Sequence, residues 1–250
     1  MGVLADPAKR KGNMYDAEII DRRAWSEHAH WFRMRLIDSP AGAPDGPFTF
    51  IPGQWLYLID SHGFRADQRA FSLGTSPADL PELELAVEIV PGGLFSPRVP
   101  TWQVGDRFTL RGPFGTFQLR ESEAAWLGGA LNSGVVPLVS MLRDRLEVAA
   151  DMERRYELLF AYSSPDHCMY GETLEALAAS HQNFTYRPVV TGSTDPAALP
   201  GSFGQGLMGA AASGNPQVYL AGLGGFIDTA SAVVLGAGVP KERLMVERYD

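Results

Sequence analysis

The sequence predicts an antiparallel β-barrel domain followed by a doubly wound α/β domain, and three observations support this fold class. The chain has 250 residues, 45% hydrophobic and 20% charged, so it can bury cores and is neither disordered nor fibrous. The period of its apolar residues changes from two to about 3.6 near residue 120. Residues 1–120 carry 13 basic and 14 acidic side chains, whereas residues 121–250 carry 8 and 15. We therefore expect domains at 13–120 and 121–250.

The first domain is predicted from short strands and dense turns. Between Glu82 and Val90, apolar residues alternate with glutamates, which predicts a half-buried antiparallel strand with one charged face. Phe32, Met34 and Leu36 alternate with arginines in the same way. Many such strands with turns between them favour a small barrel. The first dozen residues are expected to form a solvated tail.

The second domain is predicted from strands that alternate with helices. Alternation of this kind implies a parallel sheet that is covered by helices on both faces. The expected strands are residues 126–131, 156–162, 184–190 and 217–221. The expected helices have an apolar face from Val135 to Leu146, a span from Glu172 to Ala179, and an apolar face from Phe226 to Ala237.

Composition excludes several classes of protein. No apolar stretch of about 18 residues is present, so no membrane-spanning helix and no membrane partner are expected. A net charge of −8 argues against nucleic-acid binding. The single cysteine, Cys168, excludes an internal disulfide and a cysteine-ligated iron–sulfur cluster. We expect no metal site, because the pair His28 and His30 has no third ligand nearby in the sequence. With no signal peptide recognised, a cytoplasmic location is expected.

Three motifs in the first domain suit a cofactor with a planar ring system and a pyrophosphate. Arg69-Ala70-Phe71-Ser72 offers a cation, an aromatic ring and a hydroxyl at the end of a predicted strand. Gly92-Gly93-Leu94-Phe95-Ser96 offers loosened backbone amides at the start of a predicted short helix, which suits a phosphate. Gly112-Pro113-Phe114-Gly115-Thr116-Phe117 closes the barrel. Simpler explanations stay open: Phe71 as a core aromatic, the third motif as a turn, and Arg69 paired with Asp67 or Glu88.

The three motifs, in this order, resemble the flavin domain of the ferredoxin–NAD(P) reductase family, and bacterial ferredoxin (flavodoxin) reductases in particular. The resemblance implies that Phe71 stacks on the isoalloxazine, Arg69 binds the flavin phosphate and Ser72 lies near flavin N5, with Ala70 between them. It also implies that Ser96 and the amides around Gly93, Leu94 and Phe95 bind the pyrophosphate, and that Gly115 lines the cofactor site. Phe71 replaces the family's usual tyrosine, so stacking survives but a phenol hydrogen bond does not.

The second domain resembles the pyridine-nucleotide domain of the same family, with departures. Asn132-Ser133-Gly134-Val135-Val136-Pro137 matches the family's Gly-Thr-Gly-x-x-Pro loop, and asparagine tolerates the left-handed backbone that the lost glycine would adopt. Ala221-Gly222 stands where the family has Cys-Gly beside the nicotinamide. The resemblance implies nucleotide contacts by Ser133, Gly134, Gly222 and Tyr249, and help from Glu247 with proton or charge balance.

The preference between the two nucleotides is predicted from missing cations. NADPH-using relatives place arginines on the 2′-phosphate, whereas the corresponding positions here are Ser163, Gly192 and Ser202. A dianionic phosphate needs cationic donors, so NADH is favoured over NADPH.

The resemblance therefore implies a reductase that passes electrons from NAD(P)H through FAD to a separate carrier. FMN remains open as the flavin. The expected acceptor is a ferredoxin, a flavodoxin or an oxygenase component, because this chain has no cluster of its own. Ser72 and Glu247 are the expected catalytic residues. The alternative is a flavin-binding electron-transfer or redox-sensing module whose nicotinamide site has degenerated.

Overall fold

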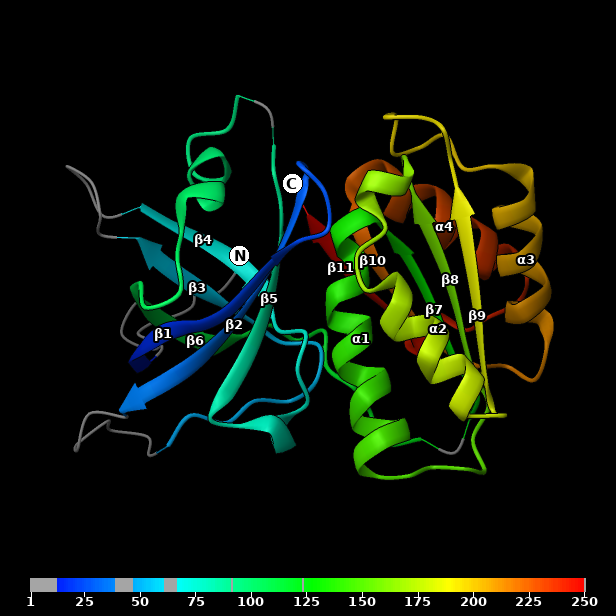
Figure 1. Ribbon diagram of the computed structural model, residues 1–250. Coiled ribbons are helices and arrows are strands. Elements are labelled where there is room, and N and C mark those ends of the chain that lie inside the picture. Colours follow the sequence, from blue (N-terminus) through cyan, green and yellow to red (C-terminus); the bar gives the residue numbers. More distant parts are fainter. Residues whose placement is uncertain (1–12, 39–46, 61–66, 91, 123, 250) are drawn as a thin grey trace, which may run out of the picture.

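The computed structural model describes residues 13–38, 47–60, 67–90, 92–122 and 124–249, and these form two lobes that each contain one sheet (Figure 1). The predicted solvated tail, residues 1–12, lies outside the described residues, as does Pro91. The first sheet uses strands between residues 13 and 114, and the second uses strands between residues 126 and 249.

The first lobe is a nearly closed antiparallel barrel of six strands in the order β4-β3-β6-β1-β2-β5. A bridge between Leu73 and Leu85 brings the two edge strands of this sheet together. The barrel interior holds the apolar side chains that alternate along the strands, as the period of two predicts. The strands are β1 (Asn13–Ala24), β2 (Ala29–Asp38), β3 (Trp55–Asp60), β4 (Asp67–Ser72), β5 (Glu82–Glu88) and β6 (Arg107–Phe114).

The second lobe is a parallel sheet in the order β11-β10-β7-β8-β9, with helices on both faces. Helices α1 and α2 cover one face and α3 and α4 cover the other, so the predicted doubly wound fold is confirmed. The strands are β7 (Trp126–Leu131), β8 (Tyr156–Tyr162), β9 (Phe184–Val190), β10 (Gln217–Leu223) and β11 (Leu244–Tyr249). The helices are α1 (Val135–Arg143), α2 (Gly171–Ser180), α3 (Gly201–Ala212) and α4 (Gly224–Gly236).

The expected first helix differs from the structure at its end. The apolar face that includes Leu146 extends past α1 into a π-helical turn, Asp144–Val148. Leu146 stays buried in that turn, so the apolar spacing identified core residues correctly but not the kind of helix. In the described part of the chain, no helix combines the length and the apolar character that a membrane span requires.

Strand β5 contradicts the prediction of a half-buried strand. Both of its faces are buried, and Glu84 is only 4% exposed. The reason is that the face carrying Glu84 is covered by the second lobe, where Arg143 of α1 donates to its carboxylate at 2.7 Å. Trp31 and Arg33 of β2 donate to the same carboxylate at 3.1 and 3.2 Å. The charged face of β5 is therefore part of the contact between the lobes.

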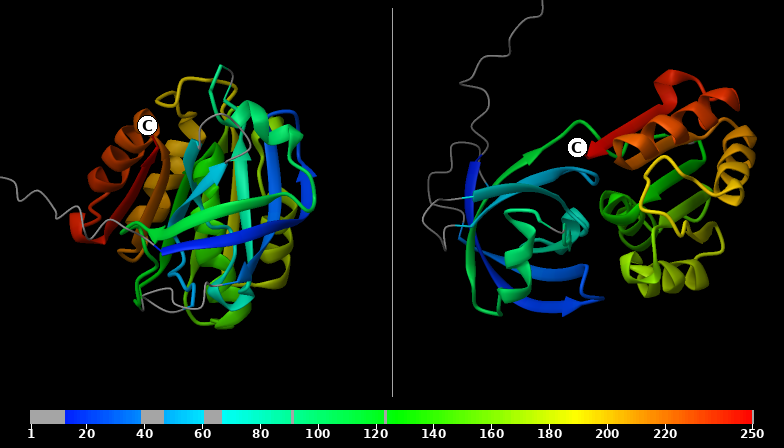
Figure 2. Two further views of the ribbon diagram at one scale, coloured as in Figure 1. Left: turned by 90° about the vertical axis from the view of Figure 1, so that its left-hand side faces the viewer. Right: turned by 90° about the horizontal axis from the view of Figure 1, so that it is seen from above.

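Helix α1 packs against the barrel and contributes to the contact between the two lobes. Its side chains Val136 and Val139 belong to a hydrophobic core that also contains Trp31 and Ala86 of the barrel. Ser140 on the same helix donates to the Thr75 carbonyl at 2.5 Å. Viewed from above, the lobes stand side by side, with the end of β11 reaching toward the barrel (Figure 2). This packing sets the carboxyl ends of the parallel strands against one edge of the barrel.

Candidate functional site

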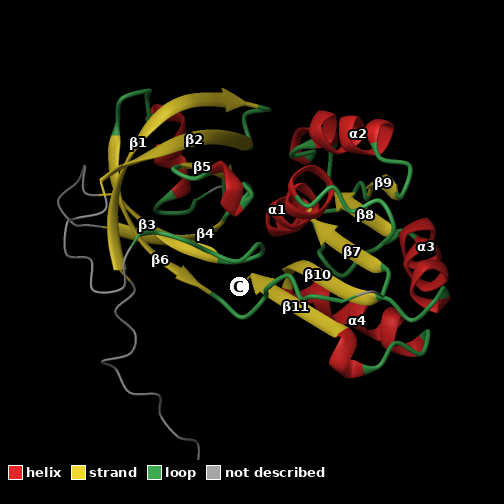
Figure 3. Cartoon of the chain, turned by 90° about the horizontal axis from the view of Figure 1, so that it is seen from below, coloured by secondary structure: helices red, strands yellow, loops and turns green. Residues whose placement is uncertain are grey.

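The candidate site lies where the last residues of several strands meet between the lobes. Strands β4 and β5 end there from the barrel, and β7 and β11 end there from the parallel sheet (Figure 3). In doubly wound sheets, ligands bind outside the carboxyl ends of the strands, because the loops and helix N-termini that gather there present unpaired backbone amides. The site therefore combines a barrel edge with the binding end of an α/β lobe.

A hydrogen bond between Ser72 and Tyr249 joins the two lobes at this point. The Ser72 hydroxyl lies 3.1 Å from the Tyr249 hydroxyl, one at the end of β4 and the other at the end of β11. Burial raises the pKa of Tyr249, and the bond from Ser72 acts in the opposite direction. The structure thus places two residues predicted from separate motifs in direct contact.

Glu247 is two residues before Tyr249, on the same face of β11. Burial raises the pKa of its carboxyl group to about 7. A carboxyl group with such a pKa can take up or release a proton near neutral pH. The sequence could indicate its position but not this property, since the property depends on what covers the side chain.

The Arg69-Ala70-Phe71-Ser72 motif forms the end of β4. Arg69 and Ala70 are exposed, and the Arg69 guanidinium donates to the Gln68 carbonyl at 3.0 Å. Phe71 is half-buried and lies against Phe95, with ring centroids 5.9 Å apart. The exposed cation and the half-buried ring suit a phosphate and a planar ring system, respectively.

The turn after β5 is built around Ser96. Its hydroxyl accepts a hydrogen bond from the Val90 amide at 2.9 Å, and the Gly93 amide donates to the Val90 carbonyl at 3.0 Å. Phe95 is buried and anchors the turn, whereas Leu94 is 83% exposed. The expected short helix is a 3-10 helix, Ser96–Thr101. Ser96 thus shapes the turn in addition to its expected contact with a pyrophosphate.

Gly115 lies beside the strand that pairs with the arginine motif. Its φ is +102°, and a Cβ there would lie 2.9 Å from the Trp55 ring. Trp55 pairs with Ser72 across β3 and β4 and with Phe114 across β3 and β6. The third motif therefore comprises the last residues of β6 and a tight turn at Gly115 near the arginine motif, which agrees with both the structural and the cofactor explanation of this glycine.

The predicted nucleotide loop is the turn between β7 and α1. Asn132 has φ 48°, the left-handed conformation expected of an asparagine that replaces glycine. A Cβ on Gly134 would collide with the Ala221 carbonyl, so the loop packs on β10 without room for a side chain. A Cβ on Gly222 would lie 3.2 Å from the Leu131 Cβ. Gly134 and Gly222 thus let the turn after β7 pack closely on the end of β10, as in the glycine-containing turns of dinucleotide-binding folds.

The three positions expected near the 2′-phosphate carry uncharged residues. Ser163 follows β8, and its amide donates to Oδ1 of Asn132 at 3.0 Å. The Gly192 amide donates to the Ser163 carbonyl at 3.2 Å, so these two residues are neighbours. Ser202 is exposed in the first turn of α3. The structure brings Ser163 and Gly192 together beside the nucleotide loop.

Sequence reasoning missed Glu88, the last residue of β5. Its carboxylate accepts hydrogen bonds from Asn132 Nδ2 at 3.1 Å and from Ser133 Oγ at 2.8 Å. His167 Nε2 lies 3.7 Å from the same carboxylate. Among the described residues Glu88 forms no ion pair with Arg69, and the side chain of Asp67, the other expected partner of Arg69, lies outside the described residues. A usable signal was present, because Glu88 ends the strand that precedes the expected phosphate loop.

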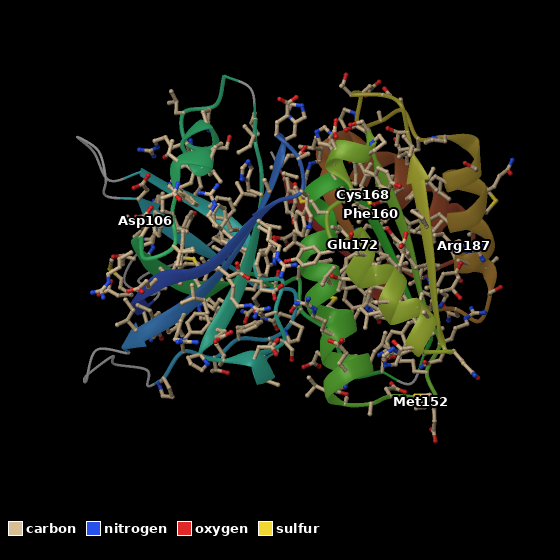
Figure 4. All side chains as sticks on the ribbon, in the orientation of Figure 1. Asp106, Met152, Phe160, Cys168, Glu172 and Arg187 are labelled. Carbon is tan, nitrogen blue, oxygen red and sulfur yellow. The ribbon has the colours of Figure 1, made fainter. Side chains whose placement is uncertain are left out.

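The histidines and the cysteine do not form a metal site within the described part of the chain, where no group of three metal-ligating side chains is found. His28 stacks on His167 across the lobe boundary, with ring centroids 5.3 Å apart. His30 is buried in the barrel wall, where burial lowers its pKa. Cys168 lies in the second lobe (Figure 4).

Comparisons with known proteins agree with the two lobes. Residues 16–119 match a family model described as an oxidoreductase FAD-binding domain, and residues 130–232 match one described as an oxidoreductase NAD-binding domain. The chain is 31% identical to ferredoxin–NADP reductase B of Sorangium cellulosum (strain So ce56), over 94% of this chain and 98% of that protein.

Two further comparisons concern a component of a larger enzyme and a solved structure. The chain is 32% identical to DmpP, the reductase component of phenol 2-monooxygenase from Pseudomonas sp. (strain CF600), over 82% of this chain. It spans 59% of the length of that component. The structure of ferredoxin–NADP+ reductase from Plasmodium falciparum superimposes with a TM-score of 0.78 at 15% identity, over 96% of this chain and 100% of the other. At that identity the likeness concerns the fold.

Proposed function

The chain belongs to the ferredoxin–NADP reductase family, and from this we infer that it passes electrons from NAD(P)H through FAD to a separate electron carrier. The observation that carries the proposal is the contact of Ser72 with Tyr249, at 3.1 Å. It joins the end of the FAD-type motif to the end of the nucleotide-type sheet, where the two cofactors would have to meet. When bound, the flavin supplies the conversion of a two-electron hydride into single electrons.

We assign the residues of this chain to binding and positioning as follows. The Arg69 guanidinium holds the flavin phosphate, Phe71 stacks on the ring system and Ser72 donates near its reactive nitrogen. Glu247 holds or releases a proton at the lobe boundary. The remaining contacts are by Ala70, Gly93, Leu94, Phe95, Ser96 and Gly115 on the flavin side, and by Ser133, Gly134, Gly222 and Tyr249 on the nicotinamide side.

FAD is favoured over FMN because the barrel matches an FAD-binding family model over residues 16–119. We propose NADH as the preferred nucleotide, because Ser163, Gly192 and Ser202 offer no cation to a 2′-phosphate. The boundary between the flavin domain, 13–120, and the nucleotide domain, 121–250, is proposed between the end of β6 and the start of β7. A cytoplasmic location also stays a prediction.

The electron acceptor is proposed to be a ferredoxin, a flavodoxin or the oxygenase component of a larger system. The names of the relatives support this range, since one is a ferredoxin–NADP reductase and another is the reductase component of a monooxygenase. Encounters of this kind bury little surface and are transient.

The function is tested by mixing the flavin-loaded protein with NADH or NADPH in the absence of oxygen. We expect NADH to abolish the visible absorbance of the oxidised flavin rapidly, and NADPH to do so more slowly. An absorbance that neither nucleotide changes would refute the reductase proposal and favour the electron-transfer or redox-sensing module. Faster bleaching by NADPH would refute only the proposed preference.

A further inference from the structure

Glu88 is a carboxylate from the barrel that occupies the turn where the second lobe would bind phosphate. It accepts from Asn132 Nδ2 at 3.1 Å and from Ser133 Oγ at 2.8 Å, and the Ser133 amide approaches it at 3.4 Å. These donors belong to the turn between β7 and the nine-residue helix α1. Hydroxyl, amide and backbone N–H donors at the start of such a helix are the groups that hold the phosphates of a nucleotide.

An anion from the chain itself therefore satisfies the donors that an anionic ligand needs. A carboxylate and a phosphate cannot share these donors, because each donor proton serves one acceptor well and the two negative charges repel each other in a partly buried site. Glu88 is about one quarter exposed, so water screens this repulsion only in part.

The contact also ties the lobes together, and neighbouring residues reinforce it. Ser26 Oγ of the barrel donates to the Asp166 carbonyl at 2.6 Å, and His28 stacks on His167. The Ile89 amide donates to the His28 carbonyl at 2.8 Å, so Glu88 is held by the strand that carries these contacts. Releasing Glu88 from the turn would loosen the boundary between the lobes.

We propose that Glu88 competes with the dinucleotide for the Asn132–Ser133 turn and so sets the affinity of the protein for NAD(P). The inference rests on the proposed function, because it takes this turn to bind the nucleotide phosphates. Glu88 acts here as an affinity-determining residue and takes no part in the chemistry. The hydrogen bonds that its carboxylate accepts stabilise the nucleotide-free protein, and a nucleotide must displace the carboxylate to bind.

The test compares Glu88→Gln and Glu88→Lys with the wild-type protein, each loaded with flavin. Calorimetric titration with NAD+ and NADP+ gives the dissociation constants, and thermal unfolding without nucleotide gives Tm. We expect the dissociation constants to fall in the order wild type, Gln, Lys, by about tenfold overall, because a repulsive charge is removed and then reversed. We expect Tm to fall in both variants, because charge-assisted bonds across the boundary are lost.

Nucleotide affinity rises while Tm falls only if Glu88 competes with the nucleotide. A purely structural residue would lower Tm and weaken nucleotide binding together. Glu18→Gln is the matched control, because Glu18 of β1 pairs with Arg107 of β6 within the barrel, at 3.0 Å, and should leave nucleotide binding unchanged. If Glu88→Lys does not fold, the Gln variant decides alone.

Nucleotide binding that is unchanged or weaker in the variants would overturn the inference while leaving the reductase proposal intact. If neither the wild-type protein nor any variant binds NAD+ or NADP+, the proposed function fails, and the inference fails with it.

Discussion

Glu247 illustrates at the scale of one residue how burial alone prepares a group for proton exchange. Burial alone, with no contribution from a charged neighbour, raises the pKa of its carboxyl group to about 7. The sequence indicated Glu247 because the last four residues resemble the carboxyl terminus of the family. The sequence pattern does not show how far the side chain is buried from solvent. Asn132 is the opposite case, since its left-handed backbone follows from the residue type itself.

Glu247 predicts a dependence of stability on pH. Because its folded-state pKa lies above the ordinary value of 4.5, its stabilising contribution is complete below that value and is lost as the pH rises through about 7. The free energy of unfolding of the wild-type protein should therefore fall between about pH 5 and about pH 8, and Glu247→Gln should abolish this fall. Denaturant unfolding at both pH values measures this loss. Glu242→Gln, an exposed neighbour, should keep the wild-type dependence, and a Glu247 variant that also keeps it would contradict the assigned burial.

At the scale of elements, the period of apolar residues located β7 to β10 of the second lobe but missed β11. The predicted runs 126–131, 156–162 and 184–190 coincide with β7, β8 and β9. Strands β7 and β8 are buried on both faces, so their apolar runs stand out against polar turns, whereas β9 lies at the sheet edge and is largely exposed. The half-burial predicted for strand β5 was wrong, because alternating apolar and charged residues show the chemistry of the two faces of a strand but not what covers each face. Its charged face is buried because the second lobe covers it, and arginines compensate the charge of Glu84 there.

The buried carboxylate of Glu84 predicts a large stability effect. Glu84→Ala would leave Arg143, which is mostly buried, without its partner at 2.7 Å, and would remove the acceptor of the Trp31 indole. Breaking a buried ion pair from one side costs about 3 kcal/mol or more. Glu82→Ala is the control, because Glu82 pairs with exposed Arg35 and such pairs contribute about 0–1 kcal/mol.

Denaturant unfolding of the two variants gives both free energies. A loss for Glu84→Ala no larger than that for Glu82→Ala would mean that the charged face of β5 does not hold the lobes together.

At the scale of the whole molecule, the fold was predictable because each lobe follows from its own local pattern. The contacts between the lobes were not, because they depend on which faces meet after folding. Ser72 and Tyr249 are 177 positions apart in the chain, and Glu88 and Ser133 are 45 apart. The motifs indicated which residues could bind cofactors, whereas only the packing of α1 against the barrel showed which of them share one site.

The central claim is that the edge formed by Arg69, Phe71 and Ser72 holds a flavin that faces the second lobe. A crystal structure of the protein grown with excess FAD tests it most directly. We predict electron density for the ring system against Phe71 and for a phosphate at Arg69, with the ring edge beside Ser72 and Tyr249. Density for FAD elsewhere, or an edge closed by its own side chains with no flavin bound, would contradict the account.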